Sequence, residues 1–192
     1  MFYWFAWLVC RLYLHIFRSF RVEGLEHFPR EGPVIVAANH QSYLDPVALG
    51  CALPRRVYYM AKEELFHIPV LRTLIRWLGA FPVKREEMDR RALRTALNLL
   101  ARGQVVGIFP EGTRSREGKL LPLQPGAALL ALKSGAPVVP VALTGTRGWW
   151  GRVRVKIGRP FYLTADGPSR SQLTEGSRKI EVALKELLGV GS

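Results

Sequence analysis

Short runs of apolar residues, each bounded by turn-forming or charged residues, recur along the chain and predict the strands of a buried sheet. Strands that are covered on both faces are typically apolar throughout rather than alternating. The flanking Gly, Pro and charged residues mark where each strand ends. The runs are residues 34–38, 57–61, 80–83, 105–109 and 138–143.

Segments with a helical repeat of apolar positions lie between these runs. Residues 86–102 show the clearest pattern, a stripe of Leu and Ala side chains followed by Gly103, a residue type that commonly ends helices. Another helix is expected to begin at Asp45-Pro46 and end near residue 53, because Asp is a good N-cap and Pro fits the first helical position. The other helical segments are residues 65–78, 125–134 and 172–188.

The alternation of strands and helices predicts a single α/β domain with a mostly parallel β-sheet flanked by helices. A chain of 192 residues can bury one proper hydrophobic core and leaves little room for a second. Residues 152–157 alternate charged and apolar side chains, which predicts a half-exposed edge strand. Residues 21–33, with two prolines and two glycines, are expected to form a polar connection.

The first twenty residues are rich in aromatic side chains, with eight Phe, Trp and Tyr residues. The uninterrupted apolar run stops at Arg11, about half the roughly twenty residues that a helix needs to cross a bilayer. On a helix, Arg11, His15 and Arg18 lie on one face, and apolar residues fill the others. This pattern predicts an amphipathic helix in the membrane interface. The alternative is an aromatic helix buried against the rest of the domain.

Lys and Arg outnumber Asp and Glu by 28 to 15, which gives a net charge of +13. Such a balance predicts an anionic partner, which could be nucleic acid, a phosphorylated substrate or an acidic membrane surface. Because the basic residues are dispersed and no nucleic-acid motif occurs, a nucleic-acid-binding protein is only a distant alternative. The two cysteines form no CxxC motif or His/Cys cluster, so we expect neither a metal site nor a disulfide framework.

A candidate catalytic pair follows the strand expected at residues 34–38, in the sequence NHQSYLD. His40 lies just past the carboxyl end of this strand, where α/β sheets usually place active sites. The Asp45 carboxylate could hold one imidazole nitrogen and leave the other as a base for a substrate hydroxyl. A simpler interpretation is also open, in which Asp45 is an N-cap and His40 a turn residue. Asp45 could also serve both purposes.

A second loop, FPEGTRS at residues 109–115, follows another buried strand and is expected at the same edge of the sheet. Its glycine, its two hydroxyl groups and Arg114 offer hydrogen-bond donors that suit a phosphate group. A plain Pro-Gly turn is the alternative. The sequence thus places a candidate base and a candidate anion site on neighbouring loops.

NHQSYLD and FPEGTRS resemble the first and third motifs of the glycerolipid acyltransferase family, which includes the lysophosphatidic acid acyltransferases. Residues 79–85 resemble the second motif through Gly79, Phe81 and Arg85. Residues 138–142, centred on Pro140, resemble the fourth. The four matches follow the family's order between about residues 20 and 145. Gln124 departs from the family pattern, which often has a basic residue there.

The resemblance implies that His40 deprotonates the acceptor hydroxyl and that Asp45 orients it. The hydroxyl would attack the thioester of acyl-CoA or an acylated carrier protein, with no cofactor or metal. For Glu111 two roles stay open, accepting a hydrogen bond from the substrate or holding Arg114 in a salt bridge. The implied substrate-binding residues are Lys62, Arg85, Glu111, Gly112, Thr113 and Arg114.

The resemblance also implies acyl transfer to lysophosphatidic acid, which forms phosphatidic acid in phospholipid biosynthesis. Glycerol phosphate, another lysophospholipid or a lyso-ornithine lipid are the alternative acceptors. We expect residues 1–20 to be a membrane-associating helix and residues 21–192 the acyltransferase domain. The expected location is the cytoplasmic face of the cell membrane, as a peripheral or monotopic protein on anionic lipids. A serine hydrolase is disfavoured because no G-x-S-x-G occurs.

Overall fold

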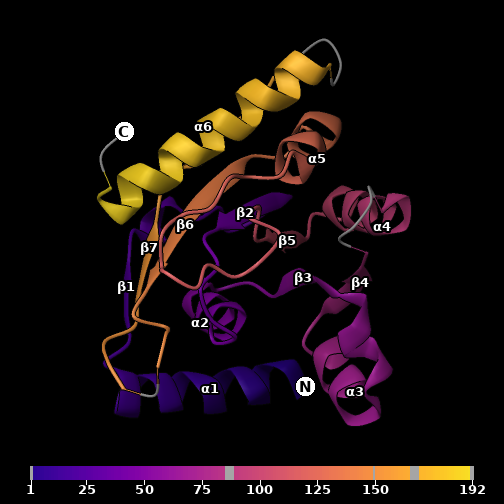
Figure 1. Ribbon diagram of the computed structural model, residues 1–192. Coiled ribbons are helices and arrows are strands. Elements are labelled where there is room, and N and C mark those ends of the chain that lie inside the picture. Colours follow the sequence, from indigo (N-terminus) through magenta and orange to yellow (C-terminus); the bar gives the residue numbers. More distant parts are fainter. Residues whose placement is uncertain (1, 85–88, 149, 165–168, 191–192) are drawn as a thin grey trace.

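A computed structural model describes residues 2–84, 89–148, 150–164 and 169–190. In this part of the chain, seven strands form one sheet in the order β1-β7-β6-β2-β5-β3-β4, with helices on both faces (Figure 1). The strands are β1 (Arg21–Glu23), β2 (Val34–Ala38), β3 (Val57–Lys62), β4 (Ala80–Val83), β5 (Val105–Ile108), β6 (Val138–Thr144) and β7 (Arg154–Ile157). The helices are α1 (Phe2–Arg18), η1 (Leu25–His27), α2 (Asp45–Ala52), η2 (Glu63–His67), α3 (Pro69–Trp77), α4 (Arg90–Ala101), α5 (Gly126–Ser134) and α6 (Arg170–Leu188).

The sheet is mostly parallel, which confirms the predicted α/β class. Strands β6, β2, β5, β3 and β4 all run in one direction, and β7 is antiparallel to β6. Strand β2 is central, with Ile35 paired to Val106 of β5 and to Val138 of β6. Because β2 and β5 are parallel neighbours, the loops that follow them leave the sheet side by side.

Two hydrophobic cores, one on each face of the sheet, explain why the central strands are apolar throughout. Helices α1 and α2 cover one face, and α4, α5 and α6 cover the other (Figure 1). Along β2, Val34 and Val36 belong to the first core, whereas Ile35 and Ala37 belong to the second. Every residue of β2 is therefore buried, as expected for a strand covered on both sides.

The prediction of an edge strand at residues 152–157 is wrong, because β1 pairs with β7 on its outer side. Strand β1 lies within the stretch expected to be a connection. It is only three residues long and carries charges at both ends, so it shows no apolar run. The alternation in β7 arises because Val155 and Ile157 enter the core on one face while Arg154 and Lys156 remain exposed on the other.

Two helical segments begin later than their apolar patterns indicate. Helix α4 begins at Arg90, after Asp89, whose carboxylate accepts hydrogen bonds from the N–H groups of Arg91 and Ala92 at 2.9 and 3.0 Å. The earlier residues 86–88 lie outside the described part of the chain. The segment at 65–78 divides into η2 and α3 because Ile68, which precedes Pro69, is extended.

Helix α1 packs its polar side against the domain. The Trp7 indole donates to the Gly50 carbonyl at 3.0 Å, and the Arg11 guanidinium donates to the Cys51 carbonyl. Arg18 is almost fully buried and donates to the Gly145 carbonyl at 2.8 Å. The helix face predicted to carry Arg11 and Arg18 is thus turned into the protein. No helix in the described residues is both long enough and apolar enough to cross a membrane.

Candidate active site

The loops after β2 and β5 meet at one edge of the sheet and bring His40 next to Glu111. The His40 backbone N–H donates to Glu111 Oε1 at 2.6 Å, and the His40 carbonyl accepts from the Ser115 N–H at 2.8 Å. The sequence placed these two loops on a common rim, and the structure brings them into direct contact. His40 is mostly buried, so the protein fixes both its backbone and its ring.

His40 and Asp45 form a hydrogen-bonded pair. The distance from His40 Nδ1 to Asp45 Oδ2 is 2.8 Å, and the Asp45 side chain is fully buried. The imidazole also stacks on the Phe109 ring, with the ring centroids 4.2 Å apart and the planes inclined by 24°. A carboxylate on Nδ1 selects the tautomer with its proton there, which leaves Nε2 free to accept a proton.

Asp45 does not cap helix α2, which corrects the N-cap interpretation. Leu44 occupies the N-cap position, and no side chain caps this helix. Asp45 Oδ2 instead accepts from the backbone N–H groups of Gln41 and Ser42, both at 2.6 Å, in addition to His40. The carboxylate therefore folds the loop around itself and points at the imidazole. Among the described atoms, Asp45 Oδ1 has no hydrogen-bond partner.

Glu111 holds the two loops together. Besides the His40 N–H, its carboxylate accepts from the Leu121 N–H at 2.8 Å. A salt bridge to Arg114, one of the two roles left open by the sequence, is not among the contacts of the described residues, because both carboxylate oxygens face backbone donors. Burial raises the pKa of the Glu111 carboxyl, and the two N–H groups offset part of that rise. Its position indicates a role in shaping the loops.

Thr113 and Arg114 of the second loop lie exposed at the rim. Gly112 has a φ of 67°, a left-handed conformation that favours glycine, and Thr113 and Arg114 follow it at the surface. The Arg114 guanidinium stacks on the Tyr43 ring, with Cζ 3.6 Å from the ring centroid. It also donates to the Tyr43 hydroxyl at 2.9 Å. Arg114 is thus an ordered cation close to His40 in the fold, with several N–H groups left to bind an anion.

Of the two remaining predicted substrate-binding residues, Lys62 and Arg85, the structure describes only Lys62. Lys62 ends strand β3, and its ammonium group pairs with Glu64 at 2.7 Å. Arg85 lies outside the described residues. In the part of the chain that the structure covers, no three His, Cys, Asp or Glu side chains gather in a way that could hold a metal ion.

Three polar residues of the first loop were not singled out from the sequence. Asn39 clamps the end of β2 to β6, since its side chain donates to the Leu143 carbonyl at 3.0 Å and accepts from the Leu143 N–H at 2.7 Å. Gln41 donates to the same carbonyl at 2.7 Å. Tyr43 supports Arg114. In the sequence these three residues are notable only because they lie close to His40. That position does not predict hydrogen bonds to residues far away in the chain.

The chain is similar to a known protein family and to individual members of it. A profile described as Acyltransferase matches residues 19–144, which include both loops. The 1-acyl-sn-glycerol-3-phosphate acyltransferase of Bacillus subtilis is 33% identical over 175 residues, covering 87% of each chain. The chloroplastic 1-acyl-sn-glycerol-3-phosphate acyltransferase BAT2 of Brassica napus is 38% identical over 156 residues. That match covers 73% of this chain but only 44% of the plant protein.

A solved structure shares the fold. The crystal structure of the 1-acyl-sn-glycerophosphate acyltransferase PlsC from Thermotoga maritima superposes with a TM-score of 0.76 at 31% sequence identity. The match covers 96% of this chain and 76% of that one. It therefore extends over the sheet, both loops and the helices that flank them. On these grounds the chain belongs to the acyltransferase family.

Proposed function

We propose that this enzyme transfers a fatty acyl group from a thioester donor to the free hydroxyl of lysophosphatidic acid, which forms phosphatidic acid. The observation that carries the proposal is the buried His40–Asp45 pair, in which the carboxylate holds Nδ1 at 2.8 Å and Nε2 has no hydrogen-bond partner among the described residues. The names of the relatives from Bacillus subtilis and Thermotoga maritima support this acceptor.

In the proposed reaction, His40 Nε2 takes the proton of the acceptor hydroxyl as its oxygen attacks the thioester carbon. The tetrahedral intermediate collapses with cleavage of the carbon–sulfur bond, and the imidazolium returns the proton to the leaving thiolate. Asp45 stabilises the positive charge on the ring while it lasts. The stack on Phe109 keeps the ring in one plane, so that Nε2 points in a constant direction.

Arg114 is the proposed ligand of the acceptor's phosphate. A phosphomonoester carries nearly two negative charges, and a planar guanidinium offers it several parallel donors. Arg85, Lys62 and Thr113 are further candidates from the sequence. A phosphate at this position suits lysophosphatidic acid, and it also suits glycerol phosphate, which is the second candidate acceptor.

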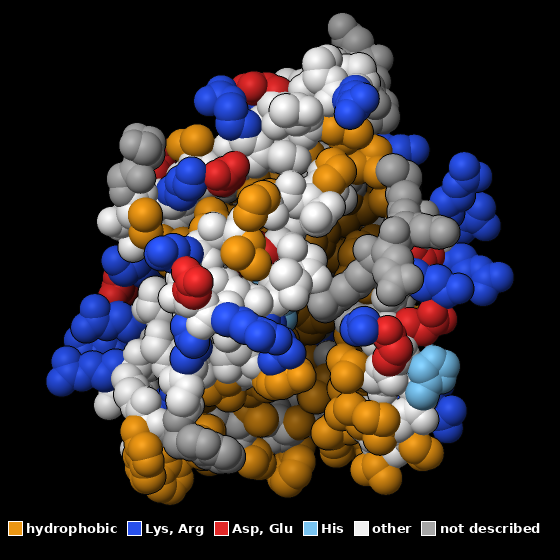
Figure 2. All heavy atoms as spheres, viewed as in Figure 1, with side chains coloured by type: hydrophobic (Ala, Val, Ile, Leu, Met, Phe, Trp, Pro, Cys, Tyr) orange, Lys and Arg blue, Asp and Glu red, His pale blue; other side chains and the backbone are white. Residues whose placement is uncertain are grey.

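The proposed acyl donor is acyl-CoA or an acylated carrier protein, since either delivers a thioester. A fatty acyl chain needs an apolar surface near the reacting atoms. Figure 2 shows a hollow with hydrophobic walls between α3 and the rest of this face.

The proposed location is the membrane surface on the cytoplasmic side, where the lysolipid acceptor is presented. Helix α1 supports this location because the side turned away from the domain is apolar, with Phe5, Ile16 and Phe17 well exposed. In water such a helix would leave a large hydrophobic surface uncovered. An interfacial position removes that cost.

Product analysis tests the proposed reaction. The purified full chain would be assayed in mixed micelles with lysophosphatidic acid, glycerol phosphate or lysophosphatidylcholine, each with acyl-CoA and with acylated carrier protein. Mass spectrometry would identify the products. Phosphatidic acid formed from lysophosphatidic acid, at a rate well above that of the other acceptors, is the expected result. Acylation only of an acceptor without a phosphomonoester would overturn the assignment of both the acceptor and Arg114.

A further inference from the structure

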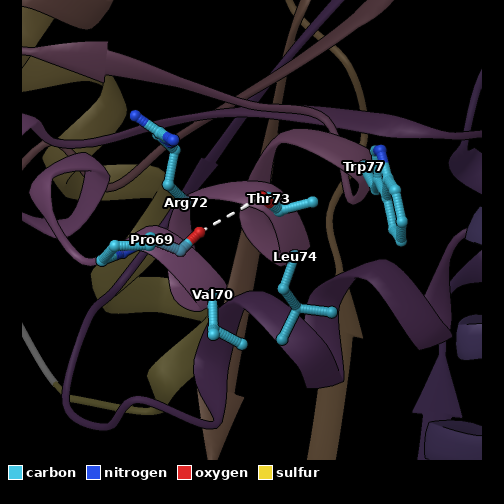
Figure 3. Close-up of a pocket in the computed structure, with 6 residues that line it drawn as sticks. All are labelled: Pro69, Val70, Arg72, Thr73, Leu74 and Trp77. Carbon is cyan, nitrogen blue, oxygen red and sulfur yellow. Dashed lines mark hydrogen bonds between the residues drawn. The ribbon is translucent and has the colours of Figure 1, made fainter.

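Helix α3 exposes apolar side chains that the proposed reaction does not use. Val70, Leu74 and Trp77 are all exposed, with Val70 at 82% of its maximum. With three neighbours on the same helix they line a shallow depression of about 520 Å³ (Figure 3). In Figure 3, Val70 and Leu74 point to the same side, and Arg72 points the opposite way. A short surface helix of this kind leaves apolar area in water unless something covers it.

The exposed side of α3 continues directly into that of α1. The Phe2 and Trp77 rings meet edge to face, with their centroids 4.7 Å apart. Figure 2 shows the hydrophobic side chains of both helices gathered along the lower edge of the molecule. We call this the α1–α3 surface. Its exposed residues are Phe2, Trp4, Phe5, Leu8, Val9, Leu12, Tyr13, Ile16, Phe17, Ile68, Val70, Leu74 and Trp77.

The charges around this surface favour an anionic partner. Neither α1 nor α3 contains Asp or Glu, and α3 carries the exposed Arg72 and Arg76. The acidic residues nearest to α3 in sequence, Glu63 and Glu64, lie opposite the ammonium groups of Lys84 and Lys62 at 4.0 and 2.7 Å. A second copy docked here would bring like charges together, which disfavours self-association.

We infer that α3 is a second bilayer-binding helix, and that the α1–α3 surface docks as one unit on a membrane with anionic lipids. The apolar side chains would enter the acyl boundary, and Arg72 and Arg76 would meet the lipid phosphates. Aromatic residues such as Trp77 prefer this depth. The inference deepens the membrane attachment proposed above. Because α3 connects β3 to β4, a docked α3 would also orient the sheet edge that carries the candidate site.

Vesicle flotation of the full chain tests this surface. The double variant Val70→Ser/Leu74→Ser leaves α1 intact, and we expect its partition onto phosphatidylcholine vesicles to fall by roughly tenfold or more. The double variant Arg72→Gln/Arg76→Gln should weaken binding by about fivefold for each arginine on vesicles with phosphatidylglycerol, and little on neutral ones. The matched control is Val182→Ser/Val190→Ser, which removes two exposed valines from another part of the surface and should bind as the wild type does.

Acyl transfer in detergent micelles, measured on the same variants, separates the possible results. Weaker vesicle binding with normal transfer in micelles would support α3 as a docking helix. If the α3 variants bind vesicles as the wild type does, α3 is not a docking helix. The same conclusion would follow if they lose acyl transfer in micelles but bind vesicles normally. A dimer of the wild type that the Val70→Ser/Leu74→Ser variant loses in sedimentation would instead assign the surface to a second copy. Absence of transfer by the wild type would count against the proposed function and leave the vesicle result valid.

Discussion

At the scale of single residues, the His40 ring is fixed by contacts of different chemistry. A fully buried carboxylate holds Nδ1, and an aromatic ring stacks on one face. The Asp45 carboxylate also accepts hydrogen bonds from two backbone N–H groups, so its position does not depend on the imidazole alone. Such preorganisation is what a general base needs, because the geometry is set before the substrate arrives.

Replacing Asp45 with Asn tests the role of its charge. The amide is close to the carboxylate in size, but it cannot stabilise the imidazolium, and its NH2 group would oppose the N–H donors of the loop. We expect kcat to fall by about 10²–10⁴. Steady-state kinetics measures this, and circular dichroism checks the fold. A folded variant with kcat within threefold of the wild type would remove Asp45 from the mechanism.

Tyr43 provides a test of the anion site. We expect Tyr43→Leu to raise the apparent KM for lysophosphatidic acid by about three- to tenfold with kcat little changed, because it removes both the stack and the hydroxyl that order Arg114. Tyr43→Phe should have a smaller effect. Tyr162→Leu, at another exposed tyrosine, is the control. An effect on the donor's KM alone would contradict the assignment of Arg114 to the phosphate.

Because Glu111 is buried, we expect the stability of the protein to depend on pH. Burial raises the pKa of its carboxyl above the ordinary value of 4.5, so the folded state holds this proton at pH values where the unfolded chain has released it. The free energy of unfolding of the wild type, measured relative to Glu111→Gln, should therefore fall as the pH rises above about 4.5. Urea unfolding of the wild type and of Glu111→Gln, at several pH values above and below 4.5, measures this difference in the free energy of unfolding. A difference that rises with pH would mean that the pKa is lowered.

The hydrogen-bonded pair of His40 and Asp45 could be predicted from the sequence, but the contacts of its neighbours could not. His40 and Asp45 lie five positions apart in one loop, so a local turn is enough to join them. Tyr43 and Arg114 are 71 positions apart, and Asn39 and Leu143 are 104 apart. Those contacts depend on which strands are neighbours. The local pattern also favoured an N-cap role for Asp45, because it does not show that the carboxylate turns back toward the loop.

At the scale of elements, the two sides of α1 differ, and the sequence presented a buried helix and an interfacial helix as alternatives. One side carries Tyr3 and Leu14 into the core, and the other side is exposed and apolar. An aromatic-rich segment fits both interpretations, and only the direction of the polar residues separates them. Since Arg11 and Arg18 bind protein carbonyls, the apolar side that remains outside is the one available to a membrane.

Paired substitutions on α1 should separate its two sides. Leu14→Ala removes a fully buried side chain and should lower the free energy of unfolding by about 2–5 kcal/mol. Ile16→Ala, at an exposed position, should change stability little and weaken vesicle binding. Chemical unfolding and flotation measure the two effects. A larger loss of stability from Ile16→Ala than from Leu14→Ala would contradict this division of the helix.

For the remaining strands and helices, the apolar pattern predicted the bounds of the buried strands well and those of other elements less well. The central strands were found at nearly their true bounds because each is a continuous apolar run between two cores. Strand β1 was missed because three residues with charged ends leave no pattern, and its pairing with β7 depends on the whole fold. Helix α4 was predicted too long because charged residues before Asp89 are compatible with a helix, whereas the cap fixes its start.

At the scale of the molecule, the parallel sheet places the site. The loops after β2 and β5 lie at the same edge because the strands are parallel neighbours, and Glu111 then ties the loops together. The α1–α3 surface lies along another edge, where both helices expose apolar side chains (Figure 2). The fold thus combines a rim that carries the candidate base with an exposed apolar surface, which fits the proposed function.

The most direct test of His40 as the base is the turnover of His40→Ala with lysophosphatidic acid and a thioester donor in mixed micelles. His67→Ala, at an exposed histidine of η2, is the control. We expect kcat of His40→Ala to fall by about 10²–10⁴ while the fold and vesicle binding are retained, and we expect the control to stay near the wild type. A folded His40→Ala protein with close to wild-type turnover would contradict the assignment of His40 as the base.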